Sequence, residues 1–334
     1  MKIDFPHRQF AHCESGVTAN LLNYHGFPCS EALVFGIGGG LFFAHVPFVK
    51  INFLPLTTFR IGPGSIFTKA TRRLGIEVVK EKFRDPVAAE KKLDHLLEAG
   101  RPVGAQTGVF WLPFFPPAYR FHFNGHNLVV IGKEGDDYLI SDPIFEETVR
   151  CPAADLRKAR FAKGALAPKG KIYSIEKMPS QYDLPQAVTA GIKEVCRGML
   201  KTPVPLAGVR GIRLLARRMS KWPDKLGEKQ TILYLGHVIR MQEEIGTGGG
   251  GFRFLYAAFL EEAAGVLEND RLLELSQHCT EIGDLWRDFA LLASRVCKGR
   301  VAIQDSFDGL AQLLNRCADE EEVLFNALWM AIKR

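Results

Sequence analysis

Apolar residues recur at three- and four-residue spacing through the second half of the chain. Five segments carry this spacing: 186–200, 229–246, 252–267, 269–297 and 306–332. It gathers apolar side chains on one face of a helix, which must then pack against another element. We therefore predict a mostly α-helical second domain over residues 177–334, a substrate or partner domain, beginning within the stretch KIYSIEKMPSQYDLP.

The first half instead alternates short apolar runs with glycine and proline. Residues 128–132 (LVVIG) and 136–143 (DDYLISDP) predict two neighbouring strands joined by a turn. Residues 85–100 predict a helix, with an aspartate cap, a proline in the first turn and a glycine after the end. Residues 101–108 should then enter the sheet. Strands and helices together predict an α+β first domain over residues 1–176.

A third pattern lies near the N-terminus, in QFAHCESGVTANLLNYHG. Val17, Leu21 and Leu22 have helical spacing, and Gly26 supplies a stop. Cys13 stands where this helix begins. Exposed backbone N–H groups and the helix dipole favour a thiolate there, and the thiolate is the nucleophilic form. A small buried apolar side chain is the alternative interpretation of this cysteine.

Composition narrows the function classes. The chain has 334 residues, 47% hydrophobic and 24% charged, which is ordinary for a globular protein. A net charge of +6 without a dominant basic run or a nucleic-acid motif argues against nucleic-acid binding. The seven cysteines are scattered and none is paired as CxxC, so we expect free thiols in a reducing compartment and no metal site.

The sequence carries no strong membrane or export signal. The N-terminal stretch MKIDFPHRQFAHCESG lacks the apolar core of a signal peptide, and we expect a cytoplasmic protein. The most apolar stretch, residues 33–56, is interrupted by His45, Pro47, Lys50 and Pro55. A transmembrane helix needs about 20 apolar residues with few charges, so we predict buried strands and a glycine loop there instead.

Two residues of the predicted hairpin complete a candidate catalytic set. His126 begins its first strand and Asp142 follows its second. In an antiparallel pair these positions lie at the same edge of the sheet, so the carboxylate can fix the tautomer of the imidazole. A thiol nucleophile, a base and an orienting group in the order Cys13, His126, Asp142 are typical of papain-like thiol enzymes. Inert structural roles for the three residues remain the alternative.

These motifs carry a family resemblance. The segments HC at residues 12–13, LLNYHG, SEALVFGIGGGL at 30–41, GHNLVVIG and SDP resemble the N-terminal domain of the butirosin-biosynthesis H-protein family. The segment GTGGGGFRFLYAAFLEEAAG at 246–265 resembles its usual C-terminal partner domain. The resemblance implies a papain-like catalytic fold for residues 1–176, with Cys13 on an N-terminal helix and an antiparallel sheet.

The resemblance also implies acyl transfer. Cys13 would attack the thioester of an acyl carrier protein, His126 would act as base and acid, and Asp142 would orient His126. The donor arm would be the phosphopantetheine of an acidic carrier protein, with no permanently bound cofactor, and the acceptor a small-molecule amine or hydroxyl. Two alternatives stay open: a thiol hydrolase (peptidase, amidase or thioesterase) and a non-catalytic scaffold that binds an acyl chain or a partner.

The oxyanion hole is less clearly marked in the sequence. The backbone N–H of Cys13 is one natural donor. Papain-like enzymes usually add a glutamine upstream, and Gln9 is the candidate here, although it stands closer to the cysteine than their spacing and His7 occupies the usual place. We expect a structural role for His12, because adjacent residues of a helix do not share a face.

Several residues are candidates for binding the substrate. The aromatic, proline-rich stretch 110–123 (FWLPFFPPAYRFHF) could line an acyl or pantetheine channel. The GTGGGGF loop and the arginine after it could hold a phosphate at a helix N-terminus, or the loop could be a flexible interhelix segment over the active site. A glutamate in SEALVF could support the site or simply begin a helix. The candidates are Glu31, Trp111, Phe114, Tyr119 and Arg253.

One stretch of the second domain concentrates positive charge. The segment VRGIRLLARRMSKWPDK contains Arg210, Arg213, Arg217, Arg218 and Lys221. It could steer an acidic carrier protein or contact a membrane surface peripherally. A solvated face of an amphipathic helix is the simpler interpretation.

Overall fold

The computed structural model describes residues 2–51 and 53–333, apart from the side chains of residues 304 and 305. The chain forms two compact units. The first comprises Met1–Val34 and Ile66–Tyr182, and the second Phe35–Ser65 and Asp183–Arg334. The division near residue 182 lies close to the predicted boundary at 176/177. The segment 35–65, however, joins the second unit rather than the first.

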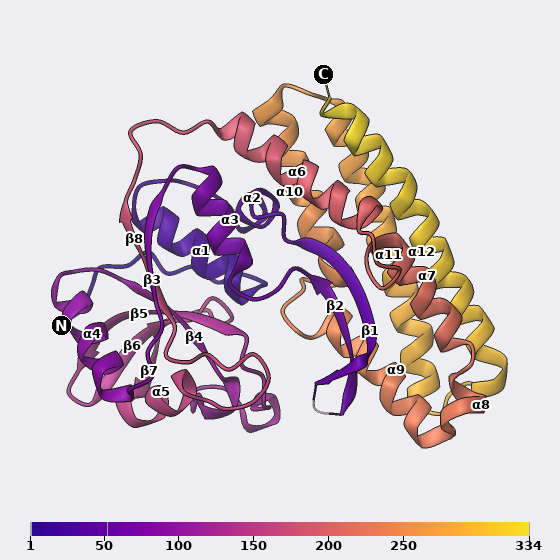
Figure 1. Cartoon of the computed structure of the whole chain (residues 1–334), viewed down its shortest axis with the longest axis horizontal. Coiled ribbons are helices and arrows are strands. Elements are labelled where there is room, and N and C mark those ends of the chain that lie inside the picture. The colour runs from indigo at the N-terminus through magenta and orange to yellow at the C-terminus, as the bar shows by residue number, and fades with distance from the viewer. Residues whose placement is uncertain (1, 52, 334) are drawn as a thin grey trace. The chain divides into compact units, whose positions relative to one another are not determined.

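The first unit is built on one antiparallel sheet of six strands in the order β3-β8-β4-β5-β6-β7 (Figure 1). The strands are β3 (Glu77–Glu81), β4 (Val103–Thr107), β5 (His126–Glu134), β6 (Asp137–Ser141), β7 (Val149–Pro152) and β8 (Ile172–Lys177). The strands β5 and β6 pair as the predicted hairpin. The sequence therefore predicted this hairpin correctly, and the predicted α+β class is confirmed.

Helices of the first unit cover this sheet. They are α1 (Cys13–Tyr24), α3 (Ser65–Arg73), α4 (Pro86–Glu98) and α5 (Ala153–Arg160), with the short turns η1 (Val109–Trp111) and η2 (Pro117–Tyr119). The first seven residues of β5 are all buried, so the strand is covered on both faces. The helices α1 and α4 both pack on it. The contact with α1 places β5, which begins at His126, beside the helix that begins at Cys13.

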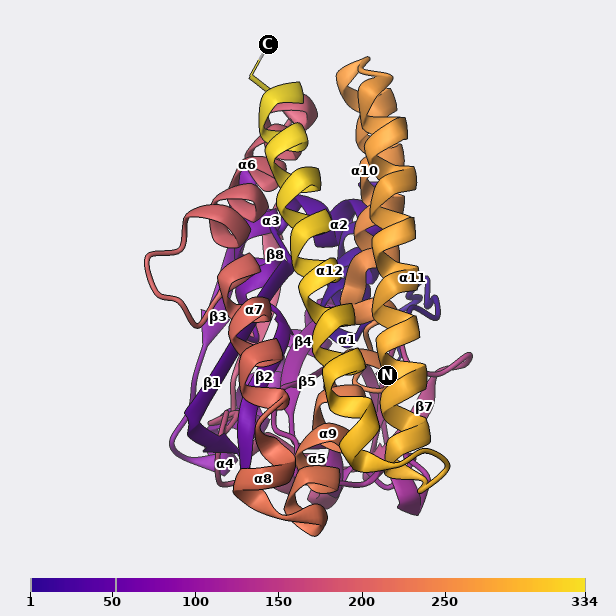
Figure 2. The ribbon, with the colours of Figure 1, turned by 90° about the vertical axis from the view of Figure 1, so that its right-hand side faces the viewer.

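The second unit is mainly helical, as predicted. Its helices are α6 (Leu184–Lys201), α7 (Gly208–Met219), α8 (Trp222–Leu226), α9 (Glu228–Glu243), α10 (Arg253–Leu267), α11 (Arg271–Cys297) and α12 (Ile303–Ala331), with η3 (Gly250–Phe252) before α10. Figures 1 and 2 show α11 and α12 running side by side along this unit. Their apolar faces account for the three- and four-residue spacing in the sequence.

A two-stranded sheet also belongs to the helical unit. The strands β1 (Leu41–Ile51) and β2 (Leu54–Arg60) pair antiparallel, β1 packs on α7 and β2 on α9. The helix α2 (Glu31–Ile37) leads from the first unit into this segment. Gly36 is required there, because an added Cβ would lie 2.0 Å from the Phe259 ring. The GIGGG motif thus serves close packing, as expected for a glycine cluster of this kind.

Within the described residues, none of the helices has the length and apolar character needed to cross a membrane. Of the stretch 33–56, β1 and the start of β2 form the predicted strands, whereas its first residues belong to α2. The prediction of buried strands holds only for the first half of β1, because Phe48 and Val49 are exposed.

Candidate functional site

Cys13 is the first residue of α1, as the sequence predicted, and it is buried with 7% of its surface exposed. The preceding residue, His12, has extended backbone angles and caps the helix. Its Nδ1 accepts a hydrogen bond from the Ser15 backbone N–H at 3.3 Å. The structural role expected for His12 is therefore a helix cap, which fixes where the helix and its cysteine begin.

Glu31 anchors the backbone that leads into the cysteine. One carboxylate oxygen accepts hydrogen bonds from the His12 N–H at 2.8 Å and the Ser15 hydroxyl at 2.9 Å, and the other accepts from the Ala11 N–H at 2.9 Å. Burial raises the pKa of Glu31, while these three bonds act to lower it. Glu31 thus supports the backbone that leads into Cys13.

His126 and Asp142 meet at one edge of the β5–β6 hairpin, where the sequence placed them. His126 Nε2 lies 2.6 Å from Asp142 Oδ2, and both residues are buried, with 4% and 0% of their surfaces exposed. The other oxygen of Asp142 accepts a hydrogen bond from the Ile144 N–H at 3.1 Å. This turn contact fixes the carboxylate, and the carboxylate in turn fixes the imidazole.

The Cys13 sulfur lies near enough to the His126 imidazole to raise the pKa of that ring. Burial alone would lower the pKa of His126, but the Asp142 charge, the Asp142 hydrogen bond and the Cys13 sulfur together raise this pKa to about 10. The imidazole is therefore held as an imidazolium at neutral pH.

Gly16 lets α1 approach the turn that carries Asp142. A Cβ added at Gly16 would lie 2.8 Å from both the Phe10 Cβ and the Pro143 Cβ. The Phe10 N–H also donates to the Pro143 carbonyl at 2.7 Å. Because Gly16 stands one helical turn after Cys13, this close packing holds the cysteine next to the hairpin edge.

Two phenylalanines beside the imidazole were not singled out from the sequence. The Phe115 ring packs edge-on to the His126 ring with centroids 5.3 Å apart, and it meets the Phe145 ring at 4.9 Å. Phe115 is buried, with 8% of its surface exposed. These rings keep water from the hydrogen bond between His126 and Asp142, which strengthens it. The SDPIFEE stretch and the doubled phenylalanine of LPFFPP were the available signals.

The residue after the nucleophile was also missed. Glu14 is fully buried, and its carboxylate accepts a hydrogen bond from the Ile66 N–H at 2.8 Å, at the N-terminus of α3. A carboxylate at a helix N-terminus is favourable because of the helix dipole. The contact fixes α1 against α3. The only sequence signal for this contact was that Glu14 is a charged residue on an otherwise apolar helix face.

The oxyanion candidate Gln9, and His7 at the usual place of the glutamine, both have other contacts. The Gln9 side chain is exposed and its amide donates to the Ile144 carbonyl at 3.1 Å. His7 bonds to the Ser141 hydroxyl at 2.8 Å and to the Phe145 carbonyl at 3.1 Å. Both side chains thus fasten the N-terminal segment to the turn after β6. The backbone N–H of Cys13 remains the candidate donor, because first-turn N–H groups have no intrahelical acceptor.

The aromatic substrate-binding candidates lie in one segment but differ in exposure. Trp111 is 37% exposed and Tyr119 is 64% exposed. Phe114 is half-buried and packs against the Phe115 and Phe145 rings, at 5.3 Å and 5.4 Å between centroids. Of the three, Phe114 is therefore the one that packs against the ring covering His126.

Arg253 does not have the surroundings of an anion site. It is 1% exposed, and its guanidinium bonds to the Glu321 carboxylate at 2.8–2.9 Å and to the Gly251 carbonyl at 2.6 Å. In the GTGGGG loop, the Gly250 N–H already donates a hydrogen bond to the Glu243 carboxylate at 3.1 Å. The predicted phosphate-binding role of this loop and arginine is replaced by a buried ion pair in the helical unit.

Comparisons with known proteins bear on both halves of the chain. Residues 12–143 match the family model described as butirosin biosynthesis protein H, N-terminal, and this range includes Cys13, His126 and Asp142. Residues 154–328, more than half of the chain, match the domain of unknown function DUF4872. No curated protein matches the chain.

Among solved structures, the chain is similar to a crystal structure described as a C39-like peptidase from Bacillus anthracis. The two share 17% sequence identity, with a TM-score of 0.38. The match covers 54% of this chain and 100% of the other.

Proposed function

The chain belongs to the family in which the N-terminal domain of butirosin biosynthesis protein H precedes a DUF4872 domain, and from this premise we propose that it is a cysteine-dependent acyltransferase. One observation carries the proposal. Cys13 begins a helix, and its sulfur lies near enough to His126 to raise the pKa of that imidazole, whose Nε2 lies 2.6 Å from Asp142 Oδ2. A nucleophile, a base and an orienting carboxylate in contact are what covalent acyl transfer needs.

The first half-reaction forms an acyl-enzyme. The Cys13 sulfur attacks the carbonyl carbon of the donor thioester, and the carbonyl oxygen takes the negative charge, facing the Cys13 backbone N–H. As the tetrahedral intermediate collapses, the bond from carbon to the donor sulfur breaks. The departing thiolate takes the proton of the His126 imidazolium, so the donor leaves as a neutral thiol and Cys13 carries the acyl group.

The second half-reaction transfers that group. An amine or hydroxyl attacks the Cys13 thioester and gives its proton to the neutral His126 imidazole, which Asp142 orients. The Cys13 sulfur then leaves as a thiolate beside the restored imidazolium, and the product is an amide or an ester. Exclusion of water decides between transfer and hydrolysis. The Phe115 ring on His126, which packs against Phe145, favours exclusion.

We propose that the donor is the phosphopantetheine arm of an acidic carrier protein. A thioester is already activated, so the site needs a thiolate, an oxyanion donor and a dry surface, without a metal or a resident cofactor. The aromatic segment containing Trp111, Phe114 and Tyr119 supports this proposal, because it offers apolar surface that leads toward the Phe115 ring.

Intact-mass spectrometry tests the proposed function. The full chain is incubated with acyl carrier thioesters, and we expect an acyl adduct that is absent from Cys13→Ala and retained by Cys29→Ala. Adding an amine should discharge the adduct faster than buffer alone. Discharge by water at the same rate would indicate a thiol hydrolase instead. No adduct with any thioester would indicate a binding scaffold.

A further inference from the structure

Exposed apolar side chains gather where β1 ends and β2 begins, in the helical unit. Phe53 is 89% exposed, Phe48 is 73% exposed and Val49 is 41% exposed. We call this group the hairpin tip. Phenylalanine is normally a core residue, and adjacent exposed apolar side chains at a turn mark interaction sites more often than single ones do.

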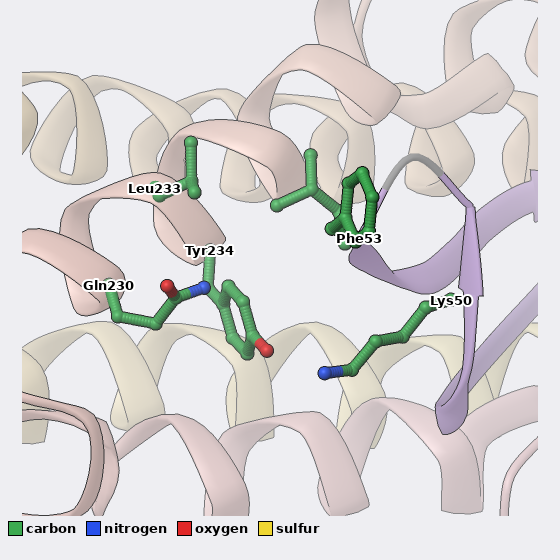
Figure 3. A pocket seen from close by; sticks show the side chains of 6 residues that line it. Lys50, Phe53, Gln230, Leu233 and Tyr234 are labelled. Carbon is green, nitrogen blue, oxygen red and sulfur yellow. The ribbon is translucent and has the colours of Figure 1, made fainter.

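The hairpin tip borders an open hollow on the surface of α9. The hollow has a volume of about 390 Å³ and is lined by Lys50, Phe53, Leu54, Gln230, Leu233 and Tyr234. Figure 3 shows the Lys50 and Tyr234 side chains extending toward one another across it, with the Phe53 ring above. Leu233 is 51% exposed. The apolar surface therefore continues from the hairpin onto the helix.

Contacts within the unit extend the same surface to α8. The Tyr234 ring, which lines the hollow, packs edge-on against the Trp222 ring of α8 at 5.7 Å between centroids. The helix α9 packs on β2, and α8 packs on α9. Figures 1 and 2 both show the end of β1, the start of β2, α8 and the start of α9 toward the same end of the helical unit. The hairpin tip, the hollow and α8 thus form one continuous region.

This region is surrounded by exposed positive charge. Its exposed basic residues are Arg217, Arg218, Lys221, Lys225 and Lys229, against the exposed acids Asp224 and Glu228. Arg218 lies near enough to His45 of β1 to lower the pKa of that histidine, after burial, which is the larger cause. The positive charge therefore extends from α7 through α8 to the base of the hairpin.

We propose that this surface docks on an anionic phospholipid membrane, with the hairpin tip inserted at the interface. Phenyl rings on a turn suit shallow insertion between lipids, and lysines and arginines around them suit negatively charged headgroups. The region offers no deep, shaped socket of the kind that a folded partner fills, since the hollow is open and half of its lining is polar or charged. The proposal is independent of the chemistry at Cys13, which belongs to the other unit.

Vesicle co-sedimentation of the full chain tests the proposal. We expect binding to vesicles of mixed phosphatidylcholine and phosphatidylglycerol, little binding to phosphatidylcholine alone, and loss of binding as salt rises. The double variant Phe48→Ser/Phe53→Ser should weaken the partition about tenfold or more. The double variant Lys225→Glu/Lys229→Glu should weaken it to a similar degree.

Matched variants separate this surface from general effects. Leu291→Ser/Val323→Ser removes two exposed apolar side chains from α11 and α12, which are 61% and 59% exposed, and should bind vesicles as the wild type does. Lys91→Glu/Lys163→Glu reverses two exposed charges in the first unit and should also bind normally. Circular dichroism of every variant checks that the fold is intact.

Three results would overturn the proposal. If the wild type and Phe48→Ser/Phe53→Ser bind anionic vesicles equally well, the two phenylalanines do not contribute to membrane binding. Absence of vesicle binding together with self-association lost in the same variant would assign the surface to a second copy of the chain. Absence of vesicle binding together with variant-sensitive binding of an acidic carrier protein would assign it to that protein.

Discussion

The charge on His126 is the feature on which the site's chemistry depends. Burial opposes a charged imidazole, and the Asp142 carboxylate at 2.6 Å more than offsets this, so the pKa of His126 rises to about 10. The pair was predictable from the sequence because both residues flank one hairpin. The Phe115 ring on His126 was not, because the proline-rich segment that carries it has no periodicity from which its path could be inferred.

Replacement of Asp142 should change the pH dependence in a known direction. The carboxylate raises the pKa of His126, so the imidazolium persists as pH rises until about pH 10. Asp142→Asn removes the charge and leaves burial, which lowers that pKa. We expect the alkaline limb of kcat/KM to move to lower pH by about a unit or more, with kcat reduced about a hundredfold or more.

The measurement is a pH profile of thioester turnover for wild type and Asp142→Asn. Asp136→Asn, an exposed aspartate before β6, is the control and should keep the wild-type profile. An alkaline limb in the same place for Asp142→Asn would show that another group controls it.

Glu31 should act on the reaction through the backbone before Cys13. In the wild type, the Ala11 N–H, the His12 N–H and the Ser15 hydroxyl all donate to the Glu31 carboxylate. In Glu31→Gln the side-chain NH2 replaces one of the two accepting oxygens, so at least one of these buried donors loses its acceptor. We expect a loss of about 1–3 kcal/mol in the free energy of unfolding. We also expect kcat to fall about tenfold while KM changes little, because the nucleophile is displaced and the substrate surface is not.

Urea unfolding and steady-state kinetics check both parts of this prediction. The exposed Glu98→Gln on α4 should change neither quantity. A raised KM with an unchanged kcat in Glu31→Gln would instead place Glu31 at the substrate.

At the scale of elements, the position of α1 depends on a single missing side chain. Gly16→Ala would place a Cβ 2.8 Å from the Phe10 and Pro143 Cβ atoms, a separation that real Cβ atoms do not show. The helix must therefore move away from the turn that holds Asp142. We expect a stability loss of about 1–3 kcal/mol and a kcat at least about tenfold lower.

Gly265→Ala in α10 is a matched control, because nothing lies within 4 Å of the added Cβ. Alanine should stabilise that helix by up to about 1 kcal/mol. Thermal unfolding and thioester turnover of both variants make the comparison. Full activity in Gly16→Ala would contradict the argument that close packing of α1 positions Cys13.

Element prediction succeeded where the signal was local. The helix α4 begins after the Asp85 cap, which accepts hydrogen bonds from the Val87 and Ala88 N–H groups, as the sequence indicated. The sequence analysis assigned residues 35–65 to the first domain, but they belong to the second unit, because β1 and β2 pack on α7 and α9, far along the chain. No local sequence pattern predicts such a long-range contact. The sequence also gave no signal for the left-handed backbone conformation of Phe252 before α10.

At the scale of the whole molecule, each unit contains a buried pair of ionisable side chains. In the sheet unit this pair is His126–Asp142. In the helical unit it is Arg253–Glu321, and the Trp286 indole N–H also donates to Glu321 at 2.7 Å. The raised pKa of Glu321 arises mainly from burial. The helices were predictable from the apolar spacing, but the partner of Arg253 lies 68 residues away and was not predictable.

Removing one member of that pair should weaken the helical unit. Glu321→Gln leaves the Arg253 charge buried without a counter-ion, and we expect the free energy of unfolding to fall by about 3–5 kcal/mol. Glu322→Gln, which affects an exposed pair with Arg213, should cost less than about 1 kcal/mol. Urea unfolding of both variants provides the measurement. Equal losses would contradict a buried, charge-dependent pair.

The most direct test of the account is the rate at which iodoacetamide alkylates Cys13, followed by peptide mass mapping at about pH 6, where an ordinary thiol is mostly protonated. If the His126 imidazolium stabilises a Cys13 thiolate, wild type should react at least about tenfold faster than His126→Ala. The exposed His95→Ala on α4 should react as wild type does. Equal rates for wild type and His126→Ala would contradict the pairing of the two residues.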